Sequence, residues 1–387
     1  MLCKMSEWKE YKFSDFVDIN PLVSLKGEKE YSFVEMKDLQ DGVKYCLPKE
    51  KRKTSSGARF NEGDTLFARI TPCLENGKIC SVKGLENGVG FGSTEFLVFR
   101  GKKDISDTNF IYYLSRWEEV RNFAENNFEG TSGRQRVPKN CFDNLKLNLP
   151  GYNEQIQIAN ILSSLDDKID LLHRQNKTLE QLAETVFRQW FVVQADEKWL
   201  KMTLSSIAIF LNGLACQKFP PTNDIDKLPV LKIKELSSGI TESSDWASTR
   251  INPEYIVKNG DVIFSWSATL IVKIWDGRDC ILNQHLFKVT SKNFPKWFYY
   301  LWCKFHLAEF ISISKSHATT MGHIKRGDLD NADVLIPSNN ELEKMSNIFE
   351  PLIEKIITNN NQLSNIIQLR DALLPRFMNG EISLGLN

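Results

Sequence analysis

The chain contains one long segment twice, and this repeat constrains its fold more than any other feature of the sequence. Residues 150–191 and 337–378 align without a gap at an offset of 187, with 11 identities in 42 positions. The identical pairs begin with Pro150 and Pro337 and end with Leu182 and Leu369. Because solenoid repeats run only ~20–50 residues, a period this long indicates a duplicated domain followed by a helix.

Upstream of the aligned segments, the two halves keep the same order of short apolar runs while losing identity. The run Gly63-Asp-Thr-Leu-Phe67 corresponds to Gly260-Asp-Val-Ile-Phe264, for example. Apolar runs after a Gly-Asp turn favour short strands, whereas residues 109–120 and 296–310 carry a helical apolar pattern. The sequence therefore predicts an α+β fold with two mixed, strand-rich globular domains over residues 1–150 and 193–337.

Each aligned segment has the apolar spacing of a long helix. Alternating steps of four and three residues over four heptads indicate a coiled-coil seam. We therefore expect one helix over residues 151–192 and a second helix with a C-terminal tail over 338–382. The short link of residues 192–198 favours antiparallel pairing of these helices within one chain. The predicted seam residues are Ile158, Leu162, Leu165, Ile169, Leu172 and Leu179 in the first helix, and Met345, Phe349, Leu352, Ile356, Leu363 and Ile366 in the second.

Several residues mark details of the two helices. Asn176 and Asn359 interrupt the apolar seam, and a buried Asn usually sets helix register. Pro351 lacks a backbone donor and is expected to kink the second helix or delay its start. Asn153 and Asn340 are the predicted N-caps.

Composition and missing motifs narrow the class of function. The 49 basic and 49 acidic residues cancel, which is mild evidence against a nucleic-acid binder but leaves a local basic face possible. Eight scattered cysteines form no Cys-x-x-Cys pair, which argues against zinc and favours reduced thiols in a cytoplasmic protein. No apolar run approaches the ~18 residues of a membrane span. No phosphate loop, dinucleotide fingerprint or metal-binding histidine pair is present, so we expect a chain that is not an enzyme and holds no metal.

Polar stretches at the expected loops are the candidate DNA contacts. The basic side chains of the flexible stretch 49–59 suit contact with DNA phosphates, although a solvated surface loop explains them equally well. Residues 129–136 combine Gln with two Arg, the residues that pair with adenine and guanine, and their counterpart 316–325 differs in chemistry. Polar residues after the Gly-Asp strand of each half suit DNA contact or strand-end hydrogen bonding. The candidate DNA contacts are Lys51, Arg52, Lys53, Arg59, Arg69, Thr71, Ser132, Arg134, Gln135, Arg136, Ser265, Ser267, Thr269, Thr319, Thr320, His323 and Lys325.

The order of these features resembles the specificity subunits of type I restriction-modification systems over essentially the whole length. Two variable domains alternate with two similar helices that each begin near Pro-x-x-Asn-Glu, at Pro150 and Pro337. The segment Val186-Phe-Arg-Gln-Trp-Phe191 and the ending Leu373-Leu-Pro-Arg-Phe-Met-Asn-Gly-Glu-Ile382 are also typical of this family. Glu341-Leu342, where the family usually has Glu-Gln, and Pro351 depart from the pattern.

The resemblance implies target recognition domains joined by conserved spacer helices. It implies double-stranded DNA with a bipartite site as the target, two adenine methyltransferase subunits docked on the helices, and motor-nuclease subunits in the full complex. S-adenosylmethionine, ATP and Mg would belong to those partners. Two alternatives stay open at this point: a single-chain methyltransferase or nuclease with an unrecognised active site, and a coiled-coil adaptor that does not read DNA.

Overall fold

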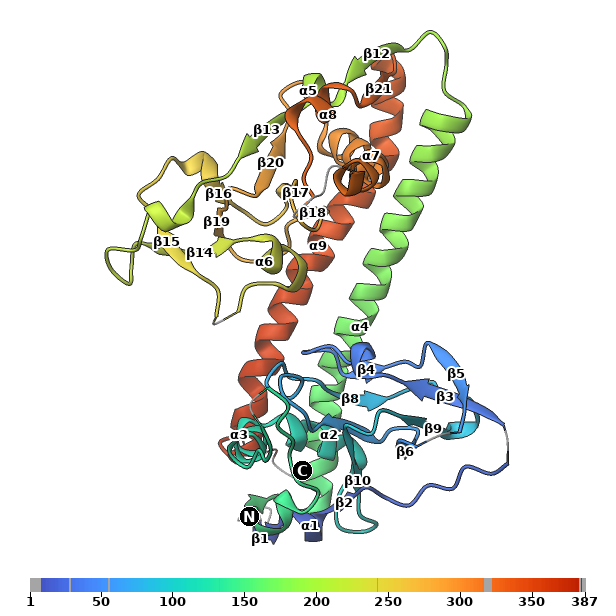
Figure 1. Cartoon of the computed structure of the whole chain (residues 1–387), viewed down its shortest axis with the longest axis vertical. Coiled ribbons are helices and arrows are strands. Elements are labelled where there is room, and N and C mark those ends of the chain that lie inside the picture. Colours follow the sequence, from blue (N-terminus) through green and yellow to red (C-terminus); the bar gives the residue numbers. More distant parts are fainter. Residues whose placement is uncertain are drawn as a thin grey trace, which may run out of the picture. The chain divides into compact units, whose positions relative to one another are not determined.

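The computed structural model describes residues 8–27, 29–54, 56–131, 133–241, 243–316, 322–382 and 384 (Figure 1). The chain divides into two compact units, and each long helix contributes to both. Unit 1 comprises residues 1–171 and 366–387, and unit 2 comprises residues 172–365. The α+β class predicted from the sequence is confirmed.

Unit 1 contains two small sheets and a terminal strand pair. The first sheet has the order β2-β10-β7-β8-β4, from Val17–Ile19, Phe96–Gly101, Thr65–Ala68, Ile79–Val82 and Tyr45–Cys46. The second has the order β5-β3-β9-β6, from Glu50–Lys53, Glu30–Val34, Val89–Gly92 and Ala58–Asn61. Strands β1 (Lys9–Lys12) and β11 (Lys146–Leu149) pair antiparallel. Helices α1 (Phe13–Phe16), α2 (Thr108–Arg116) and α3 (Glu118–Asn126) complete the domain.

Unit 2 repeats this topology with different residues. The order β13-β20-β17-β18 joins Ile209–Asn212, Leu286–Thr290, Val262–Ser265 and Val272–Ile274. The order β15-β14-β19-β16 joins Trp246–Ser248, Lys227–Leu231, Cys280–Leu282 and Ile256–Val257. The parallel pairing of β14 with β19 matches that of β3 with β9 in unit 1. Strands β12 (Leu200–Thr203) and β21 (Asp333–Ile336) pair as β1 and β11 do, and helices α5 (Leu204–Ile207), α6 (Ile233–Ser238), α7 (Lys296–Ser316) and α8 (Arg326–Asp330) complete the unit.

The repeated Gly-Asp motif is a structural element of both domains. Gly63 and Gly260 both adopt φ of 86°, a conformation that glycine adopts without the cost of a Cβ. The Asp64 carboxylate accepts a hydrogen bond from the Asn61 amide at 2.7 Å and two from the Arg100 guanidinium at 2.6 Å. The motif therefore closes the turn that opens the central strands β7 and β17.

The long helices are α4 (Tyr152–Arg188), continued by a π-helical turn Gln189–Val193, and α9 (Asn339–Met378). In unit 1, Ile158 near the start of α4 shares a core with Phe377 near the end of α9. In unit 2, Asn176 bonds Asn360, while Trp190 lies 5.5 Å from Phe349 between ring centroids. The helices therefore run antiparallel in each unit, as predicted.

The seam residues face inward, but they pack on the domains as well as on each other. Eight are buried and four, Leu165, Leu179, Leu352 and Ile366, are half-buried. Ile158 and Leu162 join the core that contains Phe110 and Phe142. The helix pair is thus continuous with the hydrophobic core of each domain.

Both predicted N-caps are wrong, and the second helix does not start late. Helix α4 begins at Tyr152, and Gly151 accepts the first helical bonds, so Asn153 lies inside the helix. Helix α9 begins at Asn339, and Ser338 forms a reciprocal capping box with Glu341, which displaces Asn340 from the cap. Pro351 does not delay α9, because a proline three turns into the helix removes only one backbone bond there.

Two further differences concern element boundaries. The predicted helix over 109–120 is two helices, α2 and α3, because the backbone at Trp117 is extended, with ψ of 136°. The predicted loop 49–59 contains strand β5, which pairs with β3 through residues 50–53. The sequence of β5 does not alternate between apolar and polar residues, because the strand lies at a sheet edge with all four side chains exposed.

Candidate nucleic-acid interface

Three segments distant in sequence meet at one junction in unit 1. The first follows strand β7 at Arg69–Thr71, the second precedes β10 at Glu95, and the third is the loop 129–137. The amide of Arg69 donates to the Glu95 carbonyl at 3.0 Å, and that of Thr71 donates to the Gln135 carbonyl at 3.0 Å. The Val137 amide donates to the Arg69 carbonyl at 2.7 Å. The structure therefore brings Arg69, Thr71, Gln135 and Arg136 together, which were predicted as separate candidates.

Unit 2 contains the same junction with other side chains. The amide of Trp266 donates to the His285 carbonyl at 3.3 Å, and that of Ala268 donates to the Gly322 carbonyl at 2.8 Å. The Ile324 amide donates to the Trp266 carbonyl at 3.0 Å. These three bonds match those of unit 1 one by one. The backbone of the junction is thus common to both domains while its side chains differ.

Some side chains of the first junction bond within the domain, and others have no such bond among the described residues. Arg136 forms an ion pair with Glu95 at 2.8 Å, and the hydrogen bonds that its guanidinium donates to the Glu95 carboxylate raise the pKa of Arg136. The Thr71 hydroxyl accepts the Gln135 amide at 3.1 Å, an internal role. Arg134 is exposed, and among the described residues its guanidinium has no ion pair. Arg69 is half-buried, and its Nε makes no hydrogen bond within the described part of the chain.

The second junction is polar but carries no arginine. The Ser267 hydroxyl lies 3.2 Å from Nδ1 of the exposed His285, and Ser267 bridges to His323 through the backbone. Trp266 donates from Nε1 to Asn212 at 3.0 Å and stacks on Phe287, so packing accounts for most of its surface. Ser265 is fully buried, and its hydroxyl closes a turn on the Thr269 carbonyl at 2.6 Å.

The other candidates of unit 2 lie around this junction. The side chain of Thr269 is exposed, and so are those of His323 and Lys325. The Lys325 amide donates to Asp328 at the start of α8, at 2.7 Å. Thr319 and Thr320, together with Ser132 of the first junction, lie outside the described residues.

The basic stretch of unit 1 is partly neutralised by carboxylates of its own domain. Lys51 pairs with Glu86, and Arg52 pairs with Glu35 while covering the Phe33 ring at 3.9 Å. Lys53 and Arg59 are exposed, and neither has an ion pair among the residues that the structure describes. Only part of this basic stretch is therefore available to phosphates.

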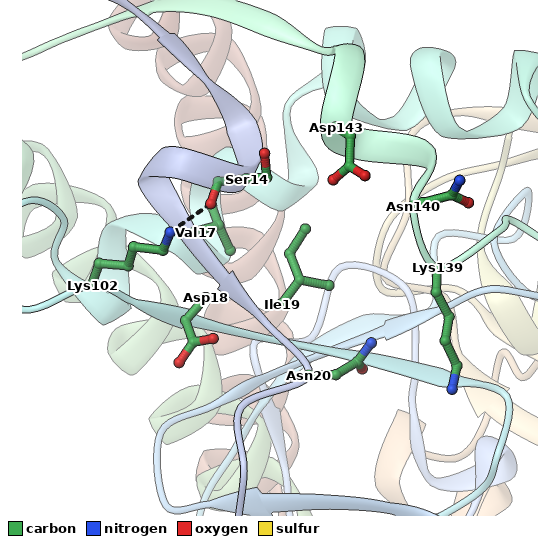
Figure 2. Close-up of a pocket in the computed structure, with 9 residues that line it drawn as sticks. All are labelled: Ser14, Val17, Asp18, Ile19, Asn20, Lys102, Lys139, Asn140 and Asp143. Carbon is green, nitrogen blue, oxygen red and sulfur yellow. Dashed lines mark hydrogen bonds between the residues drawn. The ribbon is translucent and has the colours of Figure 1, made fainter.

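A polar hollow of about 440 Å³ lies in unit 1 and is lined in part by Lys139 and Asn140 (Figure 2). Lys102 donates to the Ser14 carbonyl at 2.6 Å, and Lys139 lies on the other side of the hollow (Figure 2). Asp18 and Asp143 also line it. Opposite charges alternate around an open hollow, an arrangement that offers neither a nucleophile beside a base nor an enclosed ligand site.

Within the described part of the chain, no three His, Cys, Asp or Glu side chains are placed to hold a metal ion together. Among the same residues, no helix has the length and hydropathy needed to cross a membrane.

Glu95 and His285 also lie at the junctions, although neither is among the candidate DNA contacts. Both stand in short polar stretches that open a core strand, at 93–95 and 283–285, and from the sequence these stretches suit DNA contact and strand-end hydrogen bonding equally well. Their pairing with residues 69 and 266 depends on β7 lying next to β10 and on β17 lying next to β20. No local pattern encodes those neighbours.

Two copies of one α+β domain, each with a long helix and a polar junction of the same backbone but different side chains, define a protein with an internal repeat. The sequence matches the family described as type I restriction modification DNA specificity domain twice, over residues 5–181 and 196–369. The chain belongs to this family.

Individual relatives agree with this assignment. The chain is 27% identical over 307 residues to the type I restriction enzyme MjaIX specificity subunit of Methanocaldococcus jannaschii, covering 72% of this chain and 70% of that protein. It is 32% identical over 188 residues to the EcoEI specificity subunit of Escherichia coli, covering 46% of this chain and 32% of that protein. The crystal structure of a type I restriction-modification S subunit from M. genitalium has the same fold, with a TM-score of 0.53, 14% identity and 97% coverage of both chains.

Proposed function

We propose that this chain is the DNA-reading subunit of a type I restriction-modification complex and that each domain reads one half of a bipartite target. Residues 1–150 and 193–337 are the two reading domains. The helical segments 151–192 and 338–382 hold the domains at a fixed separation along the duplex. The observation that carries this proposal is the common junction, whose backbone bonds recur in both units while the side chains differ.

The first junction has the chemistry for reading bases. Arg134 and Gln135 carry side chains that pair bidentately with guanine and adenine in the major groove. Arg136 is held by Glu95 and fixes the loop instead of reading a base. The second junction offers Ser267, His285 and His323, which favour a different base sequence. A common scaffold with exchanged side chains is what two unlike half-sites require.

The balance of charge explains why this subunit acts within a complex. Phosphate contacts supply most non-specific DNA affinity, yet the net charge is zero and Lys51, Arg52 and Arg136 pair with internal carboxylates. The isolated chain is therefore expected to bind DNA weakly and with a small dependence on salt. Partner subunits supply the remaining phosphate contacts.

The repeated helices carry a stripe that suits two copies of one partner. At heptad spacing, α4 presents Ile161, Lys168, Gln175 and Leu182, and α9 presents the same four residue types at 348, 355, 362 and 369. Residues seven apart lie on one side of a helix. Leu182 and Leu369 are 48% and 49% exposed, so core packing does not explain their identity.

The partner that fits two equal stripes is an adenine methyltransferase subunit present in two copies. Motor-nuclease subunits join through that complex. S-adenosylmethionine binds in the methyltransferase, whereas ATP and Mg serve the motor-nuclease. Catalysis then lies wholly in the partners.

Base reading is tested by mapping adenine methylation in a naive genome after co-expression with the methyltransferase subunit. The double variant R134A/Q135A is expected to relax one half of the methylated motif and leave the other half unchanged, because only one junction is altered. The exposed Lys103→Ala variant in the same domain serves as control and should keep the full motif. A motif changed in both halves, or in neither, would contradict the proposal that this junction reads one half of the site.

Partner docking is tested by native mass spectrometry of the co-expressed complex. Leu182→Asp or Leu369→Asp is expected to remove one methyltransferase copy, and the double variant both copies. Leu171→Asp is the matched control, since Leu171 is 39% exposed on the same helix but has Thr358 at the repeated position. If the double variant retains two methyltransferase copies, the stripe is not their docking site.

A further inference from the structure

Unit 1 contains a buried ion pair between the two long helices. Nη1 of Arg370 on α9 donates to Oδ1 of Asp166 on α4 at 2.7 Å, and the two side chains are 5% and 2% exposed. The Tyr113 hydroxyl donates to the other Asp166 oxygen at 2.6 Å. Arg370 also donates to the Gly42 carbonyl at 2.7 Å. The charges are thus fully paired inside the unit.

Unit 2 contains a buried amide pair between the same helices. Nδ2 of Asn359 on α9 donates to Oδ1 of Asn176 on α4 at 2.8 Å. Nδ2 of Asn176 donates to Oδ1 of Asn360 at 2.5 Å. Asn359 is fully buried and Asn360 is 8% exposed. This layer also places polar groups on both helices opposite each other.

The internal repeat makes each polar layer correspond to an apolar one. At the offset of 187, Asp166 and Arg370 correspond to Ile353 and Ala183, which are 3% and 1% exposed in the core of unit 2. Asn176 and Asn359 correspond to Leu363 and Leu172, which are also buried. The two helices are therefore alike in their apolar seam and complementary, not alike, in their polar layers.

We propose that these two polar layers make α4 pair with α9 of its own chain and reject pairing of either helix with a second copy of itself. If α4 paired with another α4 in the same geometry, Asp166 would face Ala183 and Asn176 would face Leu172. In a pair of α9 helices, Arg370 would face Ile353 and Asn359 would face Leu363. Each like pair loses the ion pair between Asp166 and Arg370 or the amide hydrogen bonds across the helices, and it does so twice because it is two-fold symmetric. Only the mixed pair forms the Asp166–Arg370 ion pair and the two hydrogen bonds of the amide layer.

This selection determines the symmetry of the DNA target, a consequence that rests on the proposed function. A pair of like halves would present two copies of one reading domain and so recognise a symmetric split site. The mixed pair presents two different domains and recognises an asymmetric one. Asp166, Arg370, Asn176 and Asn359 are thus specificity-determining residues that act through assembly and do not contact DNA.

The pairing is tested on the full chain cut at one place. A specific protease site is inserted after Glu197, in the exposed turn between the π-helical segment and β12, and the folded chain is cleaved there. The nicked protein is unfolded in guanidinium and refolded. Native mass spectrometry then counts mixed pairs and like pairs, which a tag on one fragment distinguishes.

The cut wild-type chain is expected to return almost entirely as mixed pairs, at least about 100-fold over like pairs. The variant D166I/R370A/N176L/N359L, which gives each layer the residues of its repeat counterpart, is expected to approach the statistical ratio of one to two to one. The control K177A/N361A changes exposed residues of the same helices and should behave as wild type. If the quadruple variant does not refold, N176L/N359L provides the second arm, because those side chains bond only within the amide layer.

Two results would overturn the proposal. One is a statistical mixture from the wild-type chain, and the other is an unchanged preference for mixed pairs in both substituted chains. Neither depends on DNA binding or methylation, so failure of this inference is distinguishable from failure of the proposed function.

Discussion

Removal of the Asp166 carboxylate is predicted to break the buried ion pair of unit 1 from one side. Asp166→Ala leaves the Arg370 guanidinium 5% exposed without its main anion and deprives the Tyr113 hydroxyl of its 2.6 Å acceptor. Burial lowers the pKa of Arg370, but the nearby Asp166 and Asp371 carboxylates outweigh it and raise that pKa overall. Breaking a buried pair from one side costs about 3–5 kcal/mol. We expect a loss of this size from the free energy of unfolding of unit 1.

Amide hydrogen exchange read by mass spectrometry resolves the two units, which a single melting curve does not. Peptides of the unit 1 core should lose roughly 100- to 4,000-fold in protection, since each 1.4 kcal/mol is about a factor of ten. Asp167→Ala is the matched control, because this exposed neighbour accepts a single hydrogen bond from Tyr45 at 2.8 Å. The double variant D166I/R370A should recover a large part of the loss, because both charges are then absent. Equal protection in Asp166→Ala and Asp167→Ala would refute the reasoning.

Three further predictions concern single positions. Phe349→Ala removes a fully buried ring stacked on Trp297 at 4.4 Å and should cost unit 2 about 3–5 kcal/mol, measured as lost amide protection there. Ser338→Ala breaks the capping box with Glu341 and should cost about 1 kcal/mol, measured by urea unfolding with Asn340→Ala as a neutral comparison. Burial raises the pKa of the Cys141 thiol to about 11, so this thiol stays protonated at pH 8.5. Iodoacetamide should therefore alkylate it about 100-fold more slowly in the native than in the unfolded chain, and equal rates would contradict this.

The paired basic residues bear on how the subunit discriminates DNA. Arg136 with Glu95, and Arg52 with Glu35, hold basic groups within the domain instead of offering them to any phosphate. Arg134 is exposed and has no such partner among the described residues. If the junction reads DNA as proposed, a surface with few free charges gives weak non-specific binding, so a larger share of the binding energy depends on the base sequence.

The structure corrects the sequence analysis where tertiary pairing overrides a local pattern. The stretch Lys51–Lys53 has the composition of a flexible loop, yet β3 recruits it as an edge strand. Asn340 is a good cap residue by type, but Ser338 with Glu341 three positions later forms the reciprocal bonds that fix the helix start. Trp117 breaks a continuous helical pattern because the chain must turn between α2 and α3.

The duplication, the two long helices, their apolar seam and the family can all be inferred from the amino-acid sequence. These features are periodic or repeated, and a repeat can be recognised without coordinates. The segments that meet at the junctions are known only from the tertiary structure, because the pairing of β7 with β10 and of β17 with β20 is non-local. The tertiary structure alone also shows that Asp166 faces Arg370 and Asn176 faces Asn359. Charge and amide complementarity belongs to pairs of residues some 200 positions apart, and the antiparallel packing of α4 and α9 is what makes them pairs.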